Sequence, residues 1–593
     1  MTTNEKIFAL REAMKKENLT AYLVNTADPH QSEYISDYYR ERAWLTGFTG
    51  SAGTALLTQD AALLWADGRY FIQAEAQISG SEFKLMKMDT PGVPTLLSWL
   101  QDNLKSGDRL GVNDLLVSQA FFENTSNALA ERGVQVIAGK SLIDDLWRDR
   151  PALPSTPIFH HAIEFTGKSA AEKLQDLREE MKKSRVEATI LAGLDDIAWL
   201  YNYRGGDVDN NPVALAYSLV TEDQAKLFID ITKVPEELQA SLKDQGIEIK
   251  DYWSIAEEIT KLNVDSVALD KSKIARRLYQ ALPEKIQVKN QMDIPQELKA
   301  CLNPVELENQ RESYLRDSAV ISRFLFWVKK ETPTGQLNEW NTAEKLHEMR
   351  KSGKHFLDES FTTISAYGSN AAMMHYAPSA EKHAKLEAKS FYLCDSGAQY
   401  LDGTTDITRT IAVGPLSEEE ITDYTLTVKS HIQLARAIFL EGSTGSHLDV
   451  LARLPMWEQF MDYKCGTGHA VGYVLGVHEG PQRISKARHA VPLKLGMVIT
   501  NEPGVYKANK HGIRLENDYV VQLAGENEGD RYFKFDCLSF VPFDREAIRA
   551  SDLSPQELNW LNQYHQDCYD KLIDRMETEE EKDALKSACA PIA

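Results

Sequence analysis

The sequence has few cysteines, and no two of them have the spacing of a redox or zinc motif. Six occur in 593 residues. Their sparse, scattered positions exclude a disulfide framework and favour a reducing compartment. No apolar run of about 18 residues occurs, and residues 1–16 mix charges with apolar side chains. Neither a membrane span nor a signal peptide is therefore expected, and we expect a cytoplasmic protein.

Basic residues are also in deficit. The chain has 66 Lys and Arg against 88 Asp and Glu, a formal net charge of −22. A surface of this charge repels nucleic acid and anionic lipid, so neither is expected as a partner. Hydrophobic residues make up 43% and charged residues 26%, which is typical of a folded globular protein. The length predicts several domains.

The N-terminal half contains an internal repeat. Residues 177–191 (LREEMKKSRVEATIL) resemble residues 10–24 (LREAMKKENLTAYLV). A second match comes later in each copy, where AWLYNY at 198–203 resembles AWLTGF at 43–48. Two matches in the same order indicate a duplicated α/β domain; the alternative is chance similarity between two amphipathic helices. A proline-rich linker at 150–157 separates the copies. We predict domains at 1–153, 154–303 and 304–593.

Periodicity predicts several individual elements. Apolar residues at helical spacing predict helices over 5–17 and 306–330, and β-rich runs predict strands over 20–24, 54–57 and 62–66. Pro555 after Ser554 predicts the start of a helical tail.

Acidic residues in β-rich runs are the main chemical signal of the third domain. Residues 391–414 read as two strands joined by a turn, with Asp395 and Asp406 on either side. A carboxylate in an apolar strand is costly unless a cation compensates its charge. The alternative is that such aspartates cap turns, and Asp402 beside Gly403 fits that alternative better.

Further along, a histidine and two glutamates complete the set. His469 lies between glycines, His478 ends an apolar strand-like run, Glu502 precedes Pro-Gly, and Glu516 lies in another strand-like run. Either histidine alone is more typical of a core or surface residue. Four carboxylates with one imidazole suit hard divalent cations such as Mn²⁺, and four negative charges match two such ions. Zn²⁺ and Co²⁺ are also compatible.

Together the strings DSGAQY, DGTTD, TRT, GTGH, VHEGP, EPG and IRLEN resemble the pita-bread metallopeptidase family, most closely its long, three-domain aminopeptidase P type. The resemblance covers the whole chain. It implies two creatinase-like N-terminal domains, a pita-bread catalytic domain, and hydrolysis of the first peptide bond when proline is second. It also implies a homodimer and two metal ions. The implied ligands are Asp395, Asp406, His469, Glu502 and Glu516.

The resemblance also implies roles for other residues. Glu502 would be the general base, His375 and His478 would contact substrate, and Arg514 would support the site. The chain departs from many family members at Cys465, where they have histidine four residues before the ligand histidine. A neutral thiol does not replace an imidazolium as a proton donor, so a small buried residue is the favoured interpretation there.

Three alternatives stay open. A prolidase would cut only dipeptides, but prolidases usually lack the second N-terminal copy. Creatinase is shorter and lacks the metal ligands. A non-catalytic binding protein on the same fold would have lost ligand residues, and all five are present here.

Overall fold

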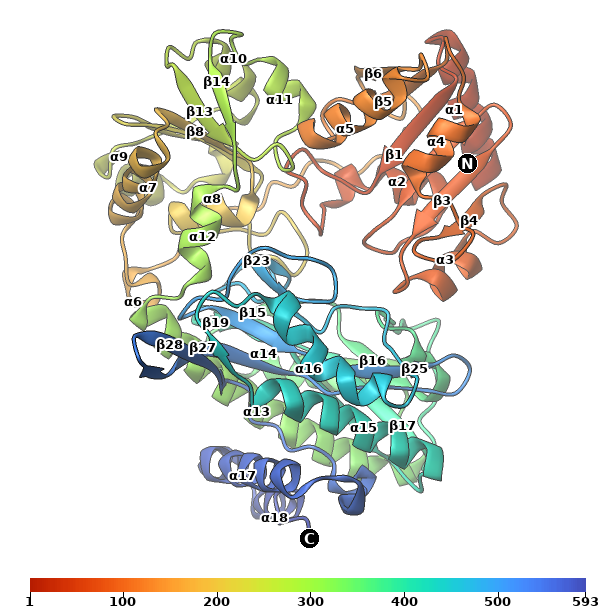
Figure 1. Cartoon of the computed structure of the whole chain (residues 1–593), viewed down its shortest axis with the longest axis vertical. Coiled ribbons are helices and arrows are strands. Elements are labelled where there is room, and N and C mark those ends of the chain that lie inside the picture. The colour runs from red at the N-terminus through yellow and green to blue at the C-terminus, as the bar shows by residue number, and fades with distance from the viewer. The chain divides into compact units, whose positions relative to one another are not determined.

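The computed structural model describes residues 1–593, and its contacts divide the chain into two compact units. The N-terminal unit comprises Met1–Ala162 and Lys168–Glu297, and the C-terminal unit comprises Ile163–Gly167 and Leu298–Ala593 (Figure 1). No helix combines the length and the apolar composition that crossing a bilayer requires. The predicted boundary between residues 153 and 154 lies inside the N-terminal unit and stays a prediction.

The N-terminal unit contains two six-stranded sheets, which Figure 1 shows in red to orange and in yellow to green. The first has the order β4-β3-β2-β1-β5-β6. Its strands are β1 (Ala21–Asn25), β2 (Thr54–Thr58), β3 (Ala62–Ala66), β4 (Lys84–Lys87), β5 (Arg109–Asn113) and β6 (Gln135–Gly139). The second has the order β12-β11-β10-β8-β13-β14. Its strands are β8 (Ala188–Leu191), β10 (Ala216–Thr221), β11 (Ala225–Ile229), β12 (Ile247–Lys250), β13 (Ser266–Leu269) and β14 (Gln287–Asn290).

Strand pairing confirms the predicted duplication. In each sheet the first strand pairs antiparallel with the second and parallel with the fifth, and the third and fourth strands are parallel. Each sheet is preceded by a helix with a capping box, α1 (Thr3–Lys16) and α7 (Ala170–Ser184). Reciprocal bonds between the cap residue and a glutamate three residues later fix where both helices begin. The strands predicted over 20–24, 54–57 and 62–66 are β1, β2 and β3.

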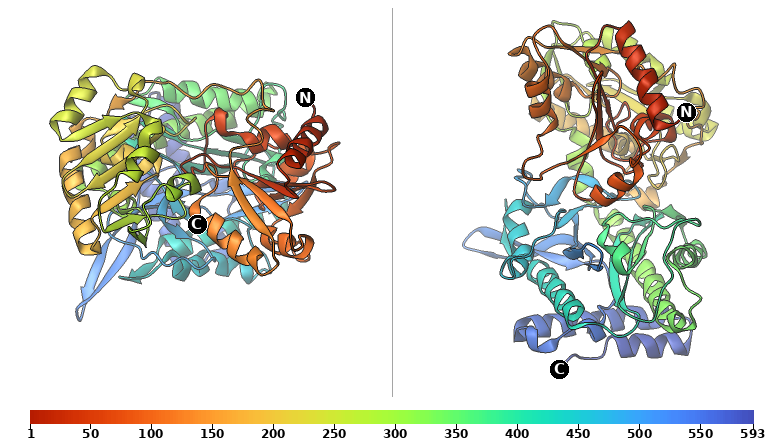
Figure 2. Two further views of the ribbon diagram at one scale, coloured as in Figure 1. Left: turned by 90° about the horizontal axis from the view of Figure 1, so that it is seen from above. Right: turned by 90° about the vertical axis from the view of Figure 1, so that its right-hand side faces the viewer.

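The C-terminal unit combines long helices with short sheets. The helices are α13 (Pro304–Glu331), α14 (Glu339–Lys351), α15 (Glu418–Ala435) and α16 (Gly445–Trp457). One three-stranded sheet has the order β16-β17-β20, formed by β16 (Ile364–Tyr367), β17 (Phe391–Ser396) and β20 (Ile407–Ala412). A four-stranded sheet has the order β21-β28-β27-β24, formed by β21 (Ile438–Leu440), β24 (Val498–Asn501), β27 (Asn517–Asn527) and β28 (Asp530–Cys537). The β27–β28 hairpin projects from its unit in both views of Figure 2.

Two short hairpins complete the part of this unit that matters below. They are β22 (Gly468–Ala470) with β23 (Glu479–Ile484), and β25 (Gly504–Lys507) with β26 (His511–Arg514). The helix predicted over 306–330 is α13, which begins two residues earlier because Asn303 caps it and Pro304 takes its first position.

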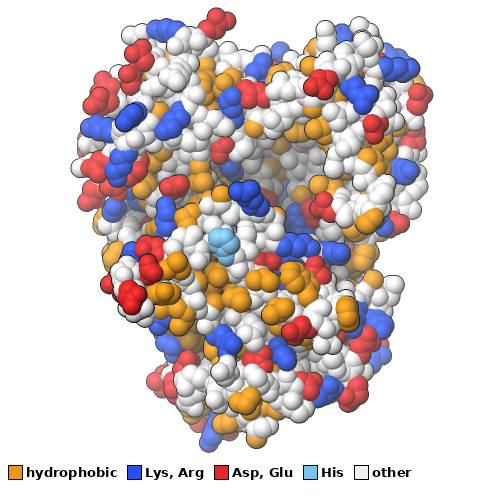
Figure 3. All heavy atoms as spheres, in the orientation of Figure 1, with side chains coloured by type: hydrophobic (Ala, Val, Ile, Leu, Met, Phe, Trp, Pro, Cys, Tyr) orange, Lys and Arg blue, Asp and Glu red, His pale blue; other side chains and the backbone are white.

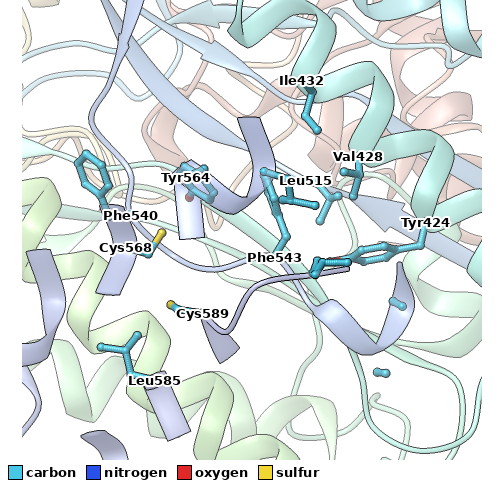
Figure 4. Close-up of a cluster of buried hydrophobic side chains, with 14 of the residues drawn as sticks. Tyr424, Val428, Ile432, Leu515, Phe540, Phe543, Tyr564, Cys568, Leu585 and Cys589 are labelled. Carbon is cyan, nitrogen blue, oxygen red and sulfur yellow. The ribbon is translucent and has the colours of Figure 1, made fainter. Parts of the chain in front are cut away.

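The chain ends in two helices, α17 (Pro555–Leu572) and α18 (Glu579–Ala588), that close a hydrophobic core. A capping box between Ser554 and Glu557 starts α17, as the sequence predicted. Figure 4 shows side chains from these helices among residues of α15 and of the segment after β28, including Tyr564, Phe543 and Tyr424. The tail is therefore part of the core of the C-terminal unit.

His565 on α17 lies in this core in its neutral form. Its ring is fully buried, and neither ring nitrogen has a hydrogen-bond partner. Burial, together with the charges of Arg545 and Arg409, lowers its pKa to about 3. The unfolded chain binds a proton at this ring below about pH 6.5 that the folded chain does not bind. Stability therefore falls as the pH falls from about 6.5 toward 3.

We expect His565→Phe to remove this acid sensitivity. Protonation of this ring in the unfolded chain lowers the unfolding free energy of the wild type by about 2 kcal/mol at pH 5. The decrease in unfolding free energy between pH 7.5 and pH 5 should therefore be about 2 kcal/mol smaller in the variant. Urea unfolding at both pH values measures it. The exposed His383→Gln is the control and keeps the wild-type loss. Equal losses in all three proteins would contradict the assignment.

Candidate metal centre

Two aspartates share a face because of how β17 and β20 pair. Asp395 lies opposite Thr408 in this antiparallel pair. Asp406 lies two residues before Thr408, so side-chain alternation puts it on the same face as Asp395. Only 7% and 3% of the two aspartates are exposed. Asp402 stands apart, because its carboxylate pairs with Arg316 at 2.5 Å; it forms an ion pair, where the sequence favoured a turn cap.

Two glutamates approach each other at the ends of strands. Glu502 directly follows β24, and Glu516 directly precedes β27. These strands are antiparallel, with Asn501 opposite Asn517, so the next residue on each side brings the glutamates together. Glu516 was expected inside a strand, but it lies in a two-residue break between β26 and β27. Its backbone N–H instead donates to the Thr408 carbonyl at 3.1 Å, which ties it to β20.

His469 on β22 points its Nε2 atom at the carboxylates. Nε2 lies 3.6 Å from Asp406 Oδ2 and 3.7 Å from Glu502 Oε1. Nδ1 lies 3.0 Å from the Ala470 carbonyl oxygen. Because a carbonyl only accepts, Nδ1 carries the proton and Nε2 keeps its lone pair, which is the tautomer a metal ligand needs. Gly468 is required here, since a Cβ would lie 2.0 Å from the Thr500 carbonyl oxygen.

The side chains gather into three overlapping groups whose ligand atoms lie within 4.8 Å of one another. The groups are Asp406, His469 and His478; His469, Glu502 and Glu516; and Asp395, Asp406 and Glu516. All five residues predicted as ligands are therefore brought together.

The electrostatics of this cluster call for cations. Burial, and then repulsion from the other carboxylates, raises the pKa of Asp406 and of Glu516 well above the usual range. Asp395 Oδ1 is buried without a hydrogen-bond partner. Four carboxylates and one imidazole form a donor set for hard divalent ions, and two such ions would neutralise the four charges. The residues thus fit a two-metal site.

Arg514 supports the cluster from β26. Its guanidinium is 3% exposed and forms an ion pair with Asp395. It also donates to the Tyr506 hydroxyl at 2.9 Å, and the Thr408 hydroxyl donates to Glu516 Oε2 at 2.6 Å. These bonds fix the orientation of two acidic side chains before any metal binds. Contact between Arg514 and a substrate stays a prediction.

Three histidine rings line one side of the cluster. The rings of His469 and His478 have centroids 4.4 Å apart in an edge-to-face arrangement, and His375 follows at 6.3 Å from His478. His478 was expected at the end of a strand-like run, but residues 471–478 form a loop and Val474 has a positive φ of 53°. The apolar residues of this run are buried as loop residues, so their composition resembles that of a strand.

Buried amide and hydroxyl groups hold the loop that carries His478. Gln399 donates from Nε2 to the Leu475 carbonyl at 2.7 Å and accepts from the Thr404 hydroxyl at 2.7 Å. Thr404 lies next to Gln310 on α13, whose amide donates to the Thr404 carbonyl at 2.5 Å. The chain of bonds from α13 to Leu475 fixes the loop. The sequence offered no signal for it, since glutamine and threonine are common in strands and turns.

Cys465 is partly buried and packs against the cluster of Leu426, Met456, Tyr463 and Val505. Burial, and then the charge of Glu502, raises the pKa of this thiol to about 12. A thiol in this environment is a weak proton donor at physiological pH. The interpretation as a small packed residue agrees with this environment.

Arg409 is a support that sequence reasoning missed. It is fully buried on β20, and its hydrogen bonds go to carbonyl, amide and hydroxyl oxygens. Its guanidinium donates to the Glu516 carbonyl at 2.6 Å, to Asn517 Oδ1 at 2.6 Å and to the Tyr564 hydroxyl at 2.8 Å. It thereby links the aspartate strand, the break that carries Glu516 and helix α17. An arginine inside the apolar run ITRTIA was the available signal.

Comparison with known families matches the whole architecture. The profile of metallopeptidase family M24 matches residues 308–522, and that of the C-terminal region of this family matches 531–592. The creatinase/prolidase N-terminal domain matches twice, at 6–146 and 149–306. The duplicated creatinase-like fold and the pita-bread catalytic fold predicted from the sequence are therefore confirmed.

Individual relatives are similar along the full length. The chain is 37% identical to aminopeptidase P1 of Lotus japonicus, over 98% of this chain and 99% of the relative. It is 37% identical to a probable Xaa-Pro aminopeptidase P of Laccaria bicolor, over 100% and 94%. Among solved structures, the X-prolyl aminopeptidase of Caenorhabditis elegans, described as a cytosolic enzyme with a di-nuclear active site, matches with a TM-score of 0.96 at 35% identity, covering 100% of both chains. The chain belongs to the aminopeptidase P group of metallopeptidase family M24.

Proposed function

We propose that this enzyme removes the first residue of peptides whose second residue is proline, with two divalent metal ions held by the five clustered ligands. The convergence of these residues in overlapping groups of three, each with its ligand atoms within 4.8 Å of one another, is the observation that carries the proposal. Full-length similarity to proteins named Xaa-Pro aminopeptidase supports the choice of substrate.

Asp395, Asp406, His469, Glu502 and Glu516 would hold the ions. When bound, two divalent ions supply Lewis acidity that polarises the peptide carbonyl and lowers the pKa of water. We propose Mn²⁺ because the donor set is rich in carboxylate oxygens. The polar bonds to Asp395 and Glu516 keep these side chains oriented for binding.

The remaining side chains would move protons and orient the substrate. Glu502 would accept a proton from the attacking water as the C–O bond forms, and would then give it to the leaving nitrogen as the peptide C–N bond breaks. His478 and His375 donate hydrogen bonds toward the carbonyl oxygen as negative charge develops there. A prolyl nitrogen carries no hydrogen in the peptide, so the site works without gripping an N–H at that position.

We further propose that the chain forms a homodimer through an apolar face of the C-terminal unit. Val450, Leu454 and Trp457 follow helical spacing on α16 and are 41%, 49% and 42% exposed, and Phe460 beyond the helix is fully exposed. Figure 3 shows hydrophobic side chains gathered over α16.

A second copy is the favoured occupant of this face. A monomer rarely exposes a contiguous apolar patch larger than roughly a few hundred Å². A fully exposed phenylalanine alone contributes roughly 200 Å², and a stable dimer buries roughly 800 Å² on each partner. One face can meet itself across a two-fold axis.

We also propose a cytoplasmic location and three domains at 1–153, 154–303 and 304–593. All six cysteines are free thiols, which suits a reducing compartment. The enzyme of Caenorhabditis elegans is described as cytosolic.

Three peptides distinguish the proposed activity from its alternatives. After chelation and addition of Mn²⁺, mass spectrometry follows an X-Pro-Y-Z peptide, its X-Ala-Y-Z counterpart and an X-Pro dipeptide. We expect only the first to lose its N-terminal residue, and only with metal. Cleavage of the dipeptide alone would indicate a prolidase. No cleavage despite bound metal would indicate a binding protein.

Removing one ligand should weaken metal binding without unfolding the protein. We expect added Mn²⁺ to raise the melting temperature of metal-free wild type, because a bound ion adds about 2.7 kcal/mol of stability at a hundredfold excess over its Kd. Asp395→Asn should lose most of this rise and bind fewer than two ions by elemental analysis. The exposed Asp530→Asn is the control and should keep both. A larger rise with Zn²⁺ or Co²⁺ would overturn the choice of Mn²⁺.

A charge in the apolar face should separate the proposed dimer. Leu454→Lys would bury an unpaired ammonium at the interface, so we expect sedimentation equilibrium to report a monomer. Ile72→Lys is a matched control, because Ile72 is also 49% exposed but lies on α3 (Phe71–Gln77) of the N-terminal unit. The proposal fails if both variants sediment as wild type.

A further inference from the structure

Glu339, at the first position of α14, is a fully buried carboxylate whose bonding partners are all uncharged. Its two oxygens accept five hydrogen bonds. The donors are Tyr367 N (2.7 Å), Asn370 Nδ2 (3.0 and 3.1 Å), Tyr376 Oη (2.7 Å) and Ala384 N (2.6 Å). A buried anion of this kind is stabilised by its donors and by the helix N-terminus.

These donors come from both ends of a single segment, residues 367–384. Tyr367 ends β16 and Ala384 precedes the return of the chain toward β17. The backbone N–H of Glu339 also donates to the Ala384 carbonyl at 3.0 Å. The Glu339 side chain therefore joins the two ends of a loop that main-chain pairing at Tyr367 and at Lys385 also holds.

His375 lies inside a smaller ring of bonds within that segment. The Asn370 carbonyl accepts from Met373 N at 3.0 Å, and the Met373 carbonyl accepts from Tyr376 N at 3.1 Å. The side chains of Asn370, before His375, and of Tyr376, after it, both donate hydrogen bonds to Glu339. These bonds complete a ring of contacts around His375. Glu339 contacts the residue that directly follows His375.

We propose that Glu339 is a positioning residue for His375, setting the path of its loop and hence the place of the imidazole beside His478. This rests on the proposed role of His375 in the reaction. Arg514 donates to the neighbouring Met374 carbonyl at 3.2 Å, which gives the loop a second attachment on the side of the metal ligands. Glu339 supplies the attachment on the opposite side, from α14.

The isosteric glutamine tests this role sharply. Each oxygen of Glu339 accepts from a backbone N–H, one from Tyr367 and the other from Ala384. A backbone N–H does not reverse its direction as a hydroxyl does. In Glu339→Gln the amide NH₂ must therefore face one of these N–H groups, and one end of the loop loses its hydrogen bond to this side chain.

A double-mutant cycle with His375→Ala separates positioning from general destabilisation. We expect Glu339→Gln to lower kcat/KM on the X-Pro-Y-Z peptide by about tenfold or more. In the His375→Ala background the same change should lower it by less than about twofold, because the group it acts through is already absent. The Mn²⁺-induced rise in melting temperature should be unchanged, while hydrogen exchange in residues 367–384 becomes faster.

Tyr376→Phe provides a second variant should Glu339→Gln fail to fold. It removes one hydroxyl bond to Glu339, and we expect a smaller loss of kcat/KM that also disappears in the His375→Ala background. Tyr201→Phe is the matched control, since its buried hydroxyl bonds Ser218 in the N-terminal unit and its loss should leave kcat/KM unchanged.

Equal fold-losses from Glu339→Gln with and without His375 would overturn the inference and leave the proposed function intact. An unchanged kcat/KM in Glu339→Gln, with His375→Ala impaired, would overturn it as well. If His375→Ala itself has full activity, the proposed role of His375 fails and the positioning role of Glu339 fails with it.

Discussion

Mutual repulsion among four clustered carboxylates, three of them buried and Glu502 partly exposed, is the constraint on which the C-terminal unit depends. Asp406 and Glu516 have strongly raised pKa values because burial and neighbouring acids both oppose ionisation. A fold that brings these groups together is stable with all four ionised only when cations share the site. Metal binding and the folding of this region are therefore linked, and the surrounding hydrogen bonds act to keep the acids at one place.

The sequence predicted the chemistry of the site better than its geometry. Acidic residues in apolar runs pointed to four carboxylate ligands and one imidazole, because a carboxylate is costly to bury alone, and the family resemblance implied that the imidazole is that of His469. The strand register that places Asp395 and Asp406 on one face depends on pairing, which local sequence does not specify. The break that contains Glu516 and the loop that ends at His478 were predicted to be strands, because buried loops and buried strands have similar compositions.

The duplicated fold was predictable because its evidence is local. The repeat at 10–24 and 177–191 falls on a helix and the strand that follows it, and both helices begin at a capping box. The supports of the site were not predictable for the opposite reason. Glu339 and Gln399 act on loops that reach them only after folding, and nothing in their own neighbourhoods distinguishes them from surface residues.

The bond from Arg409 to Tyr564 has a consequence for how this chain can vary in evolution. It joins the strand that follows Asp406 to a helix that begins about 150 residues later, and the same guanidinium holds the Glu516 carbonyl. A change at position 564 therefore reaches the acidic cluster through one side chain. Positions 409 and 564 should be inherited as a pair, and lineages that shorten the C-terminal helices should carry a compensating replacement of the arginine.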